Sequence, residues 1–290
     1  MEKIMPKKIL ILGSKGMLGH MLFYNLSIYE NFKIYNFSHK IKLNSKSINC
    51  NVFDILDLEK KIKKIKPDVI INCIGIIIQN IENKVSDSIY VNAFFPNKLK
   101  EIVRPFKTKI IHISTDCVFN GKKGNYSEKD IPNETNIYGL SKFLGEINEK
   151  PHLTIRTSII GPEINSEGRG LMHWIFMQSG KIKGYDKVLW GGVTTLELSK
   201  VIYHCIKNNI YGLFHVTNGE PISKYELLKI IKEKFNLVKV KIKPYSEIIS
   251  DKSLKSIRND ISYKVPSYYK MISDLYEFYK KNKGLYKYNL

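Results

Sequence analysis

The chain has 290 residues, of which 43% are hydrophobic and 26% charged, which is enough for one large α/β domain with a smaller lobe and argues against disorder. Its formal charge is +20, but only four of its 47 basic residues are arginines, and the lysines are spread along the chain. This distribution favours a solvated lysine-rich surface over a groove built to bind nucleic acid. The positive charge would still help to attract an anionic ligand.

Cysteine spacing and hydropathy exclude several other classes of protein. The four cysteines are far apart and form no CxxC pair or Cys/His cluster, so the sequence predicts neither a disulfide framework nor a metal site. The apolar run that follows the basic residues 1–8 is too short for a signal peptide, and no apolar stretch approaches the roughly 20 residues of a membrane helix. We therefore expect a cytoplasmic chain that does not associate with membranes.

Short apolar runs alternate with longer amphipathic segments in the first half of the chain, which is typical of βαβ units on a parallel sheet. The pattern predicts an α/β fold with a Rossmann-type doubly wound sheet. Its strands are expected at residues 8–12, 32–37, 69–73, 109–114 and 153–157, and its first two helices at 18–29 and 56–65.

The second half has a looser pattern. A loop at 162–170, a helix at 171–179 and a second loop at 180–193 precede a helix at 196–207 and a strand at 213–217, and two more helices follow at 224–235 and 267–282. We expect residues 1–160 to form a cofactor-binding domain, with 194–217 returning to its sheet. Residues 161–193 and 218–290 would form a smaller, interleaved substrate-binding lobe.

A glycine-rich loop directly follows the first predicted strand and opens the first predicted helix. It has the GxxGxxG spacing, whereas an isolated glycine cluster is often only a turn. In this position it favours a dinucleotide site, because the backbone can approach a pyrophosphate and the helix amino terminus offers free N–H groups. The residues are Gly13, Ser14, Lys15, Gly16, Met17, Leu18 and Gly19.

The end of the second strand indicates which cofactor would bind. Rossmann folds that prefer NAD usually carry Asp or Glu there to bind the ribose 2′-hydroxyl, and residues 35–40 contain no acid. Ser38, Lys40 and Lys15 could instead bind a 2′-phosphate. NADPH is the predicted cofactor, NADH is left open, and the alternative is that these are ordinary surface residues.

Tyr138 and Lys142 are four residues apart, which places a phenol and an ammonium one turn apart on a helix. A tyrosine can protonate the alkoxide formed when a ketone is reduced, and a nearby lysine cation stabilises the phenolate. This YxxxK spacing also arises by chance in a lysine-rich chain. Thr115 strengthens the prediction because it follows an apolar strand, where its hydroxyl could polarise a substrate carbonyl, although a turn or cap would explain a lone hydroxyl there.

Six motifs together resemble the extended short-chain dehydrogenase/reductase family, and most closely its dTDP-4-dehydrorhamnose reductase branch. They cover about the first 160 residues. The motifs are ILGSKGMLG (11–19), KPDVIINC (66–73), VNA (91–93), HISTDCVFNG (112–121), YGLSKFLGE (138–146) and IRTS (155–158).

The resemblance implies roles for individual residues. Thr115, Tyr138 and Lys142 match the catalytic residues of the family, and Thr115 and Asp116 would also contact the sugar. Asn92 matches an asparagine near the site, although a buried structural asparagine is an equal reading. The remaining matches concern the cofactor: Gly16, Met17 and Leu18 at the pyrophosphate, Asp54 and Ile55 at the adenine, and Cys73, Ile74 and Gly75 beneath the cofactor.

The departures from the family pattern lie on the substrate side. Cys117 and Asn120 replace the tyrosine and aspartate of STDYVFDG, and Ile159 replaces the tryptophan of RTSW. Trp190 lies in a segment that also differs; it could stack on the base or the sugar, but a large aromatic is more often part of the core.

The main hypothesis is therefore an NADPH-dependent reductase of a nucleotide-linked 4-keto-6-deoxy sugar. A nucleotide-sugar epimerase or dehydratase of the same fold is the first alternative, and Cys117 after Asp116 argues against a dehydratase, which commonly has a second acid there. The remote alternative is a non-catalytic nucleotide-binding or RNA-binding protein. The nucleotide, the sugar, the product stereochemistry and the oligomeric state, including a homodimer, are left open.

Overall fold

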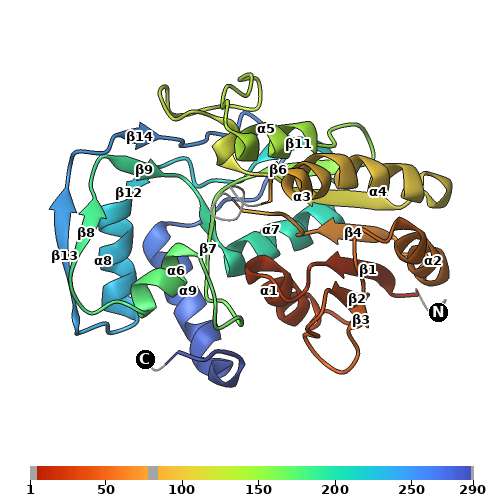
Figure 1. Ribbon diagram of the computed structural model, residues 1–290, viewed down its shortest axis with the longest axis horizontal. Helices are drawn as coiled ribbons and strands as arrows, with labels where there is room; N and C mark the ends of the chain where they lie inside the picture. The colour runs from red at the N-terminus through yellow and green to blue at the C-terminus, as the bar shows by residue number, and fades with distance from the viewer. Residues whose placement is uncertain (1–4, 78–83, 289–290) are drawn as a thin grey trace.

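A computed structural model describes residues 5–77 and 84–288, so the first four residues of the basic start lie outside the described part. Figure 1 shows a central sheet covered by helices at the right, where the N-terminus also lies, and a smaller lobe at the left that carries the C-terminal helices.

Seven strands form one sheet in the order β11-β6-β5-β4-β1-β2-β3, and every neighbouring pair is parallel. The order reverses between β1 and β4, the kind of switch point at which ligands bind in such sheets. The Rossmann-type prediction is confirmed, and β3 is a short strand that the sequence pattern did not indicate. The strands are β1 (Lys7–Leu12), β2 (Phe32–Ser38), β3 (Ile48–Asn49), β4 (Val69–Asn72), β5 (Lys109–Ile113), β6 (Leu153–Arg156) and β11 (Gly212–His215).

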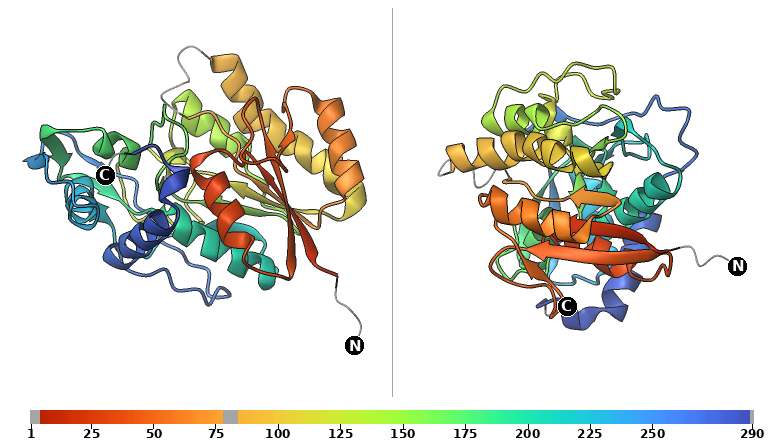
Figure 2. Two further views of the ribbon diagram at one scale, coloured as in Figure 1. Left: turned by 90° about the horizontal axis from the view of Figure 1, so that it is seen from below. Right: turned by 90° about the vertical axis from the view of Figure 1, so that its right-hand side faces the viewer.

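Helices cover both faces of this sheet (Figure 2). Ile9 and Ile11 of β1 point to the face covered by α1 and α7, while Leu10 and Leu12 point to the face covered by α2 and α4. Because strands buried on both faces lose the polar alternation, β1 and β4 appear in the sequence as continuous apolar runs. The helices are α1 (Met17–Leu26), α2 (Ile55–Ile65), α3 (Val85–Ile89), the π-helical turn η2 (Tyr90–Phe94), α4 (Phe95–Val103), α5 (Ile137–Leu144) and α7 (Thr195–Lys207).

The smaller lobe contains short strands that the sequence pattern did not predict. Residues 180–193, expected as a loop, contain β8 (Gly180–Tyr185), β9 (Val188–Trp190) and β10 (Val193–Thr194). The loop prediction was wrong because β8 pairs with β13 (Val240–Tyr245), some sixty residues further along the chain, and the pairing cannot be read from local periodicity. The remaining elements of this part are β7 (Ile159–Ile160), α6 (Leu171–Phe176), β12 (Ile222–Ser223), α8 (Lys224–Lys234), β14 (Ser250–Asp251) and α9 (Tyr268–Lys281).

Two features are absent from the part of the chain that the structure describes. No helix among residues 5–77 and 84–288 has the length and apolar character needed to cross a membrane. The same residues contain no group of three or more His, Cys, Asp or Glu side chains arranged to hold a metal ion.

Candidate active site

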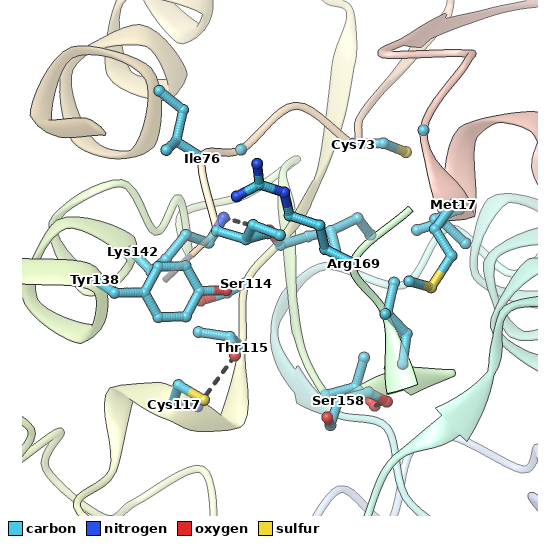
Figure 3. Close-up of a pocket in the computed structure, with 18 of the residues that line it drawn as sticks. Met17, Cys73, Ile76, Ser114, Thr115, Cys117, Tyr138, Lys142, Ser158 and Arg169 are labelled. Carbon is cyan, nitrogen blue, oxygen red and sulfur yellow. Dashed lines mark hydrogen bonds between the residues drawn. The ribbon is translucent and has the colours of Figure 1, made fainter. Parts of the chain in front are cut away.

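A cavity of about 440 Å³ lies at the carboxyl edge of the sheet, where β1, β4 and β5 end. Figure 3 shows its side chains, which come from the glycine loop, from the ends of β4 and β5, from α5 and from the segment after β7. The lining includes Gly16, Met17, Leu18, Cys73, Ile74, Gly75, Thr115, Asp116, Cys117, Tyr138, Lys142, Ser158, Glu163, Arg169 and Leu171.

A second cavity of about 510 Å³ adjoins the first, because Gly16 and residues 73–76 line both. The second cavity lies on the β2 side of the switch point. An elongated hollow made of two halves is suited to a dinucleotide, whose two nucleosides are joined by a pyrophosphate. The lining of the second cavity includes Gly13, Lys15, Ser38, His39, Lys40, Cys50, Asn51, Val52 and Phe53.

The glycine loop has the geometry that its spacing predicts. Gly13 has a φ of +79°, and the N–H groups of Gly13 and Ser14 donate to the carbonyl of Phe37 at 3.1 and 3.0 Å. A Cβ on Gly19 would lie 2.1 Å from the Gly13 oxygen, so only glycine lets the helix pack this closely on the turn. No side chain caps the amino terminus of α1, which leaves its first N–H groups for an anion.

Two predicted cofactor residues, Ser38 and Lys40, line the second cavity, and Lys15 lies there with them. The Ser38 hydroxyl is buried and has no hydrogen-bond partner among the described residues, as expected of a group that binds a ligand. Ser14 is buried outside the lining, where its hydroxyl donates to Asn36 Oδ1 at 3.1 Å and joins the loop to β2.

The predicted adenine contacts lie just outside the cavity. The Asp54 side chain caps α2 by accepting from the Asp57 N–H at 3.0 Å, and Ile55 begins that helix. The segment before them supplies the wall, since residues 50–53 line the second cavity. Phe53, which is about half exposed, presents the aromatic ring of this wall.

Thr115, Tyr138 and Lys142 line the same cavity, although they come from different elements. Thr115 follows β5 and caps a 3-10 turn, with its hydroxyl 3.1 Å from Asp116 Oδ1 and accepting from the Cys117 N–H at 3.1 Å. Burial raises the pKa of the Tyr138 phenol, and its hydrogen bond with Thr115 opposes that rise. Tyr138 is therefore a protonated donor around neutral pH.

Lys142 lies one turn after Tyr138 on α5, and its Nζ donates to the carbonyl of Ile113 at 2.7 Å. Burial lowers the pKa of Lys142 to about 8, and the nearby carboxylate of Glu146 opposes the fall. The ammonium is thus fixed at the carboxyl end of β5, on the same helix as Tyr138 and one turn after it. Tyr138, Lys142 and Thr115 thus line one cavity, and their catalytic roles stay a prediction.

Residues 7–256 match the model of the RmlD substrate binding domain family. The chain belongs to this family. A dTDP-4-dehydrorhamnose reductase from Aggregatibacter actinomycetemcomitans is 34% identical over 236 residues, which cover 76% of each chain. Methionine adenosyltransferase 2 subunit beta from Bos taurus is 24% identical over 262 residues, covering 83% of this chain and 76% of the relative.

Solved structures agree with this assignment. A hypothetical dTDP-4-dehydrorhamnose reductase from Sulfolobus tokodaii superposes with a TM-score of 0.77 at 30% identity, covering 90% of this chain and 98% of the other. A dTDP-4-dehydrorhamnose reductase from Bacillus anthracis, solved in complex with NADP, gives a TM-score of 0.79 at 23% identity, covering 94% and 100%. The resemblance to the reductase branch of the extended dehydrogenases is confirmed.

Two residues assigned to the substrate lie away from the cavity of this RmlD-family chain. Asn92 is buried in η2, where its side chain accepts from the Ile76 N–H and donates to the Ile76 carbonyl, both at 2.9 Å. Trp190 packs against Tyr268, and its Nε1 donates to Ser158 Oγ at 2.8 Å. Both therefore support residues that line the cavity, whereas Asp116 lines it directly.

The segment after β7 contributes Glu163, Arg169 and Leu171 to the cavity, and none of the three is among the predicted site residues. The RmlD-family resemblance in the sequence covers only about the first 160 residues, so it could not assign them. A signal was nevertheless available. Arg169 is one of four arginines in the chain, and glycines flank it on both sides.

Proposed function

We propose that this chain is an NADPH-dependent reductase of a nucleotide-linked 4-keto-6-deoxy sugar. The observation that carries the proposal is that Thr115, Tyr138 and Lys142 line one cavity together with the amino terminus of α1. The similarity to reductases named for dTDP-4-dehydrorhamnose, at 34% and 30% identity, supports the same substrate class.

The described residues fit NADPH. The uncapped amino terminus of α1 would hold the pyrophosphate, and Ser38, Lys40 and Lys15 would hold the 2′-phosphate, for which the unpartnered Ser38 hydroxyl is already buried in the cavity wall. Bound NADPH would supply the hydride that reduces the keto carbon. The side chains of this chain then have three tasks, which are to polarise the carbonyl, to protonate the oxygen and to hold the cofactor.

Thr115 would donate a hydrogen bond to the keto oxygen and stabilise the negative charge that develops there. Tyr138 would give its phenolic proton to that oxygen, completing the hydroxyl group of the product. Burial raises the pKa of Tyr138, so the phenolate that remains needs a neighbouring cation, and Lys142, one turn further along α5, would provide it. A proton from solvent then restores the phenol.

A third cavity, of about 400 Å³, supports a nucleotide-linked substrate. It is lined by Leu171, Trp174, Ile182, Lys183, Tyr185, Lys224 and Leu228, and Leu171 also lines the catalytic cavity. Trp174 and Tyr185 offer aromatic faces to a base, and the two lysines offer positive charge to a diphosphate. The size and chemistry of this hollow suit a nucleoside diphosphate whose sugar extends toward Tyr138.

Epimerases and dehydratases of the same fold are less well supported. The residue after Asp116 is Cys117, so the chain lacks the second acid that dehydratases commonly have there. A dTDP-glucose 4,6-dehydratase from Bacillus anthracis superposes with a TM-score of 0.76, but at 16% identity it shows the fold alone.

We also propose that the reductase works in the cytoplasm and without a nucleic-acid partner. All four cysteines are free, which suits a reducing compartment. A homodimer stays a prediction, which sedimentation of the purified chain would test.

The test is to follow NADPH absorbance with a panel of dTDP-, UDP- and GDP-linked 4-keto-6-deoxy sugars. At least one sugar should be reduced with one NADPH consumed per product. Tyr138→Phe should lower kcat by about 10²- to 10⁴-fold with little change in NADPH binding. Tyr211→Phe removes a hydroxyl from a residue that is 44% exposed and should keep full activity. Full turnover by Tyr138→Phe, or no oxidation of NADPH with any sugar, would refute the proposal.

A further inference from the structure

The segment of residues 162–170, here called the strap, connects β7 to α6 and lies against the glycine loop. A Cβ on Gly170 would lie 2.3 Å from Met17 Cε, so the strap backbone is in close contact with the first residue of α1. Glu163, Arg169 and Gly170 line the catalytic cavity together with Gly16 and Met17. The strap therefore forms the wall that faces the amino terminus of α1.

Arg169 extends from the strap into this cavity. Figure 3 shows its side chain between Met17 on one side and Tyr138 and Lys142 on the other. A ligand that runs from the amino terminus of α1 to the catalytic phenol has to pass this guanidinium. A guanidinium is planar and presents paired N–H donors, which match the oxygens of a phosphate.

The position of Arg169 along the strap is set by Glu163. One oxygen of that carboxylate, Oε1, accepts from the backbone N–H of Arg169 at 2.9 Å and from that of Gly170 at 2.7 Å. The backbone N–H of Glu163 in turn donates to the hydroxyl of Tyr288 at 3.0 Å, and this hydroxyl also lies 3.0 Å from His173 Nδ1. Tyr288 thus joins the start of the strap to α6.

Residues 286–288, here called the tail, also reach the glycine loop. The hydroxyl of Tyr286 lies 3.1 Å from His20 Nε2, and His20 Nδ1 donates to the carbonyl of Gly16 at 2.9 Å. Burial lowers the pKa of His20 to about 4, so its ring is neutral and Nε2 accepts from Tyr286. The tail, which lies beyond the residues 7–256 that match the family model, therefore ties together the two walls that face each other across the cavity.

We propose that Arg169 binds the diphosphate of the dinucleotide from the side opposite the amino terminus of α1, and that Tyr288 positions Arg169 through Glu163. This inference rests on the proposed function, because it assumes that NADPH occupies the two adjoining cavities. The diphosphate of the nucleotide sugar has the same chemistry, and we assign Arg169 to the cofactor because Gly16, Met17 and Leu18 share its cavity, whereas Lys183 and Lys224 serve the third one.

The first test is calorimetric titration of Arg169→Met and Arg169→Lys with three ligands. A hydrogen-bonded charge pair of this kind corresponds to a roughly 10- to 100-fold change in affinity, so Arg169→Met should bind NADPH that much more weakly, and Arg169→Lys should recover part of the loss. Binding of 2′-phospho-ADP-ribose, which keeps the diphosphate but lacks nicotinamide, should weaken equally. Binding of 2′-AMP, which has no diphosphate, should not change.

Arg104→Met is the matched control, because Arg104 follows α4 and precedes β5, at the opposite edge of the sheet. It should bind all three ligands as the unmodified chain does. If the unmodified chain does not bind NADPH, the proposed function fails. If it does bind NADPH and Arg169→Met binds NADPH equally well, the inference about Arg169 fails while the proposed function stands. A higher KM for the nucleotide sugar with an unchanged Kd for NADPH would overturn the assignment to the cofactor.

The second test concerns the positioning role of Tyr288. Tyr288→Phe keeps the ring and removes the hydroxyl that accepts from Glu163, so the KM for NADPH should rise several-fold while kcat stays unchanged. Tyr279→Phe is the control, because the Tyr279 hydroxyl lies in the same aromatic cluster and has no hydrogen-bond partner among the described residues. Its KM for NADPH should not change. An equal rise in both variants, or a fall in kcat alone, would overturn the positioning role.

Discussion

Glu146 and Arg156 form a two-point ion pair in the interior, with Arg156 Nε 2.7 Å from Oε1 and Nη2 2.7 Å from Oε2 of the carboxylate. Both side chains are at most 3% exposed. Ser114, at the end of β5, donates to the same Oε1 at 2.7 Å, and Lys142 binds the carbonyl of the preceding residue, Ile113. The pair therefore holds the junction of β5 and α5, from which Thr115, Tyr138 and Lys142, the three proposed catalytic side chains, project.

Glu146→Gln should strongly destabilise the protein. The amide cannot neutralise Arg156, and breaking a buried ion pair from one side costs about 3–5 kcal/mol. Urea unfolding monitored by circular dichroism would measure the loss. Glu101→Gln is the comparison, since Glu101 pairs with Lys98 on the surface, where water and salt screen the pair and its loss should change the stability little. Equal stability losses in the two variants would contradict a structural role for the buried pair.

The activity should fall as the pH rises through the pKa of Lys142. Burial lowers this pKa to about 8, so the free enzyme loses the cation that stabilises the phenolate above that pH, and kcat/KM should drop with a limb near pH 8. Over the interval from about pH 8 to the usual lysine range, the unfolded chain holds more protons at this position, so the destabilising contribution of the buried lysine shrinks as the pH rises.

The matched variant for this profile is Lys109→Met. Burial also lowers the pKa of Lys109 to about 8, but Lys109 bonds to the carbonyl of Ile210 and does not line the catalytic cavity. Its removal should leave the limb in place, whereas the residual activity of Lys142→Met should show no limb near pH 8. If the limb near pH 8 vanished in Lys109→Met, the titration would belong to Lys109 and its assignment to Lys142 would be wrong.

Gly19→Ala should disrupt the glycine loop. The added Cβ would lie 2.1 Å from the Gly13 oxygen and 2.8 Å from Ser14 Cα, both backbone atoms that cannot move independently. We expect a loss of about 1–3 kcal/mol in the free energy of unfolding and weaker NADPH binding. Gly284→Ala has no heavy atom within 4 Å of its Cβ and should change neither quantity. Thermal unfolding would measure the stability of the two variants, and calorimetric titration would measure their affinity for NADPH. An unchanged NADPH affinity in Gly19→Ala would count against the loop as the pyrophosphate site.

The four cysteines should resist alkylation while the protein is folded. Burial raises the pKa of Cys50 to about 11 and those of Cys117 and Cys205 to about 12, and it raises that of Cys73 further still. Because the thiolate is the reactive form, iodoacetamide near neutral pH should react slowly with the folded chain and with all four thiols after unfolding in guanidinium. Mass spectrometry of the adducts measures both. Rapid labelling of Cys117 in the folded chain would show that its thiol is activated.

The sheet could be predicted because the sequence signal of each long strand lies within the strand and the turns that bound it. Each of its long strands is an apolar run bounded by turn residues, and the glycine loop marks where the first strand meets its helix. The smaller lobe was harder to predict, since β8 alternates exposed lysines with the buried Ile182 and Gly184 and pairs with a strand far away in the chain. No local signal indicates such a pairing.

The residues of the candidate site likewise fall into those that the sequence could predict and those that only the fold reveals. Tyr138, Lys142 and Thr115 were found because their chemistry requires fixed residue types at fixed spacing. Trp190 was open to two readings, and only the fold shows that it is buried and that its Nε1 bonds to Ser158, which lines the cavity. Arg169 was not predicted as a site residue because its proposed role depends on the packing of the strap against Met17. The sequence of neither segment alone indicates that contact.

The cavity lined by Ser38 and Lys40 takes all its lining from residues 12–91, whereas the third cavity takes its lining from residues 171–228. Under the proposed function, mutations that accumulate in the later stretch would alter which nucleotide carrier of the sugar is accepted while leaving the affinity for the dinucleotide intact. A lineage can thus explore new substrates without losing its reductant, and recombining only the later stretch between relatives would be a direct way to exchange their substrate preferences.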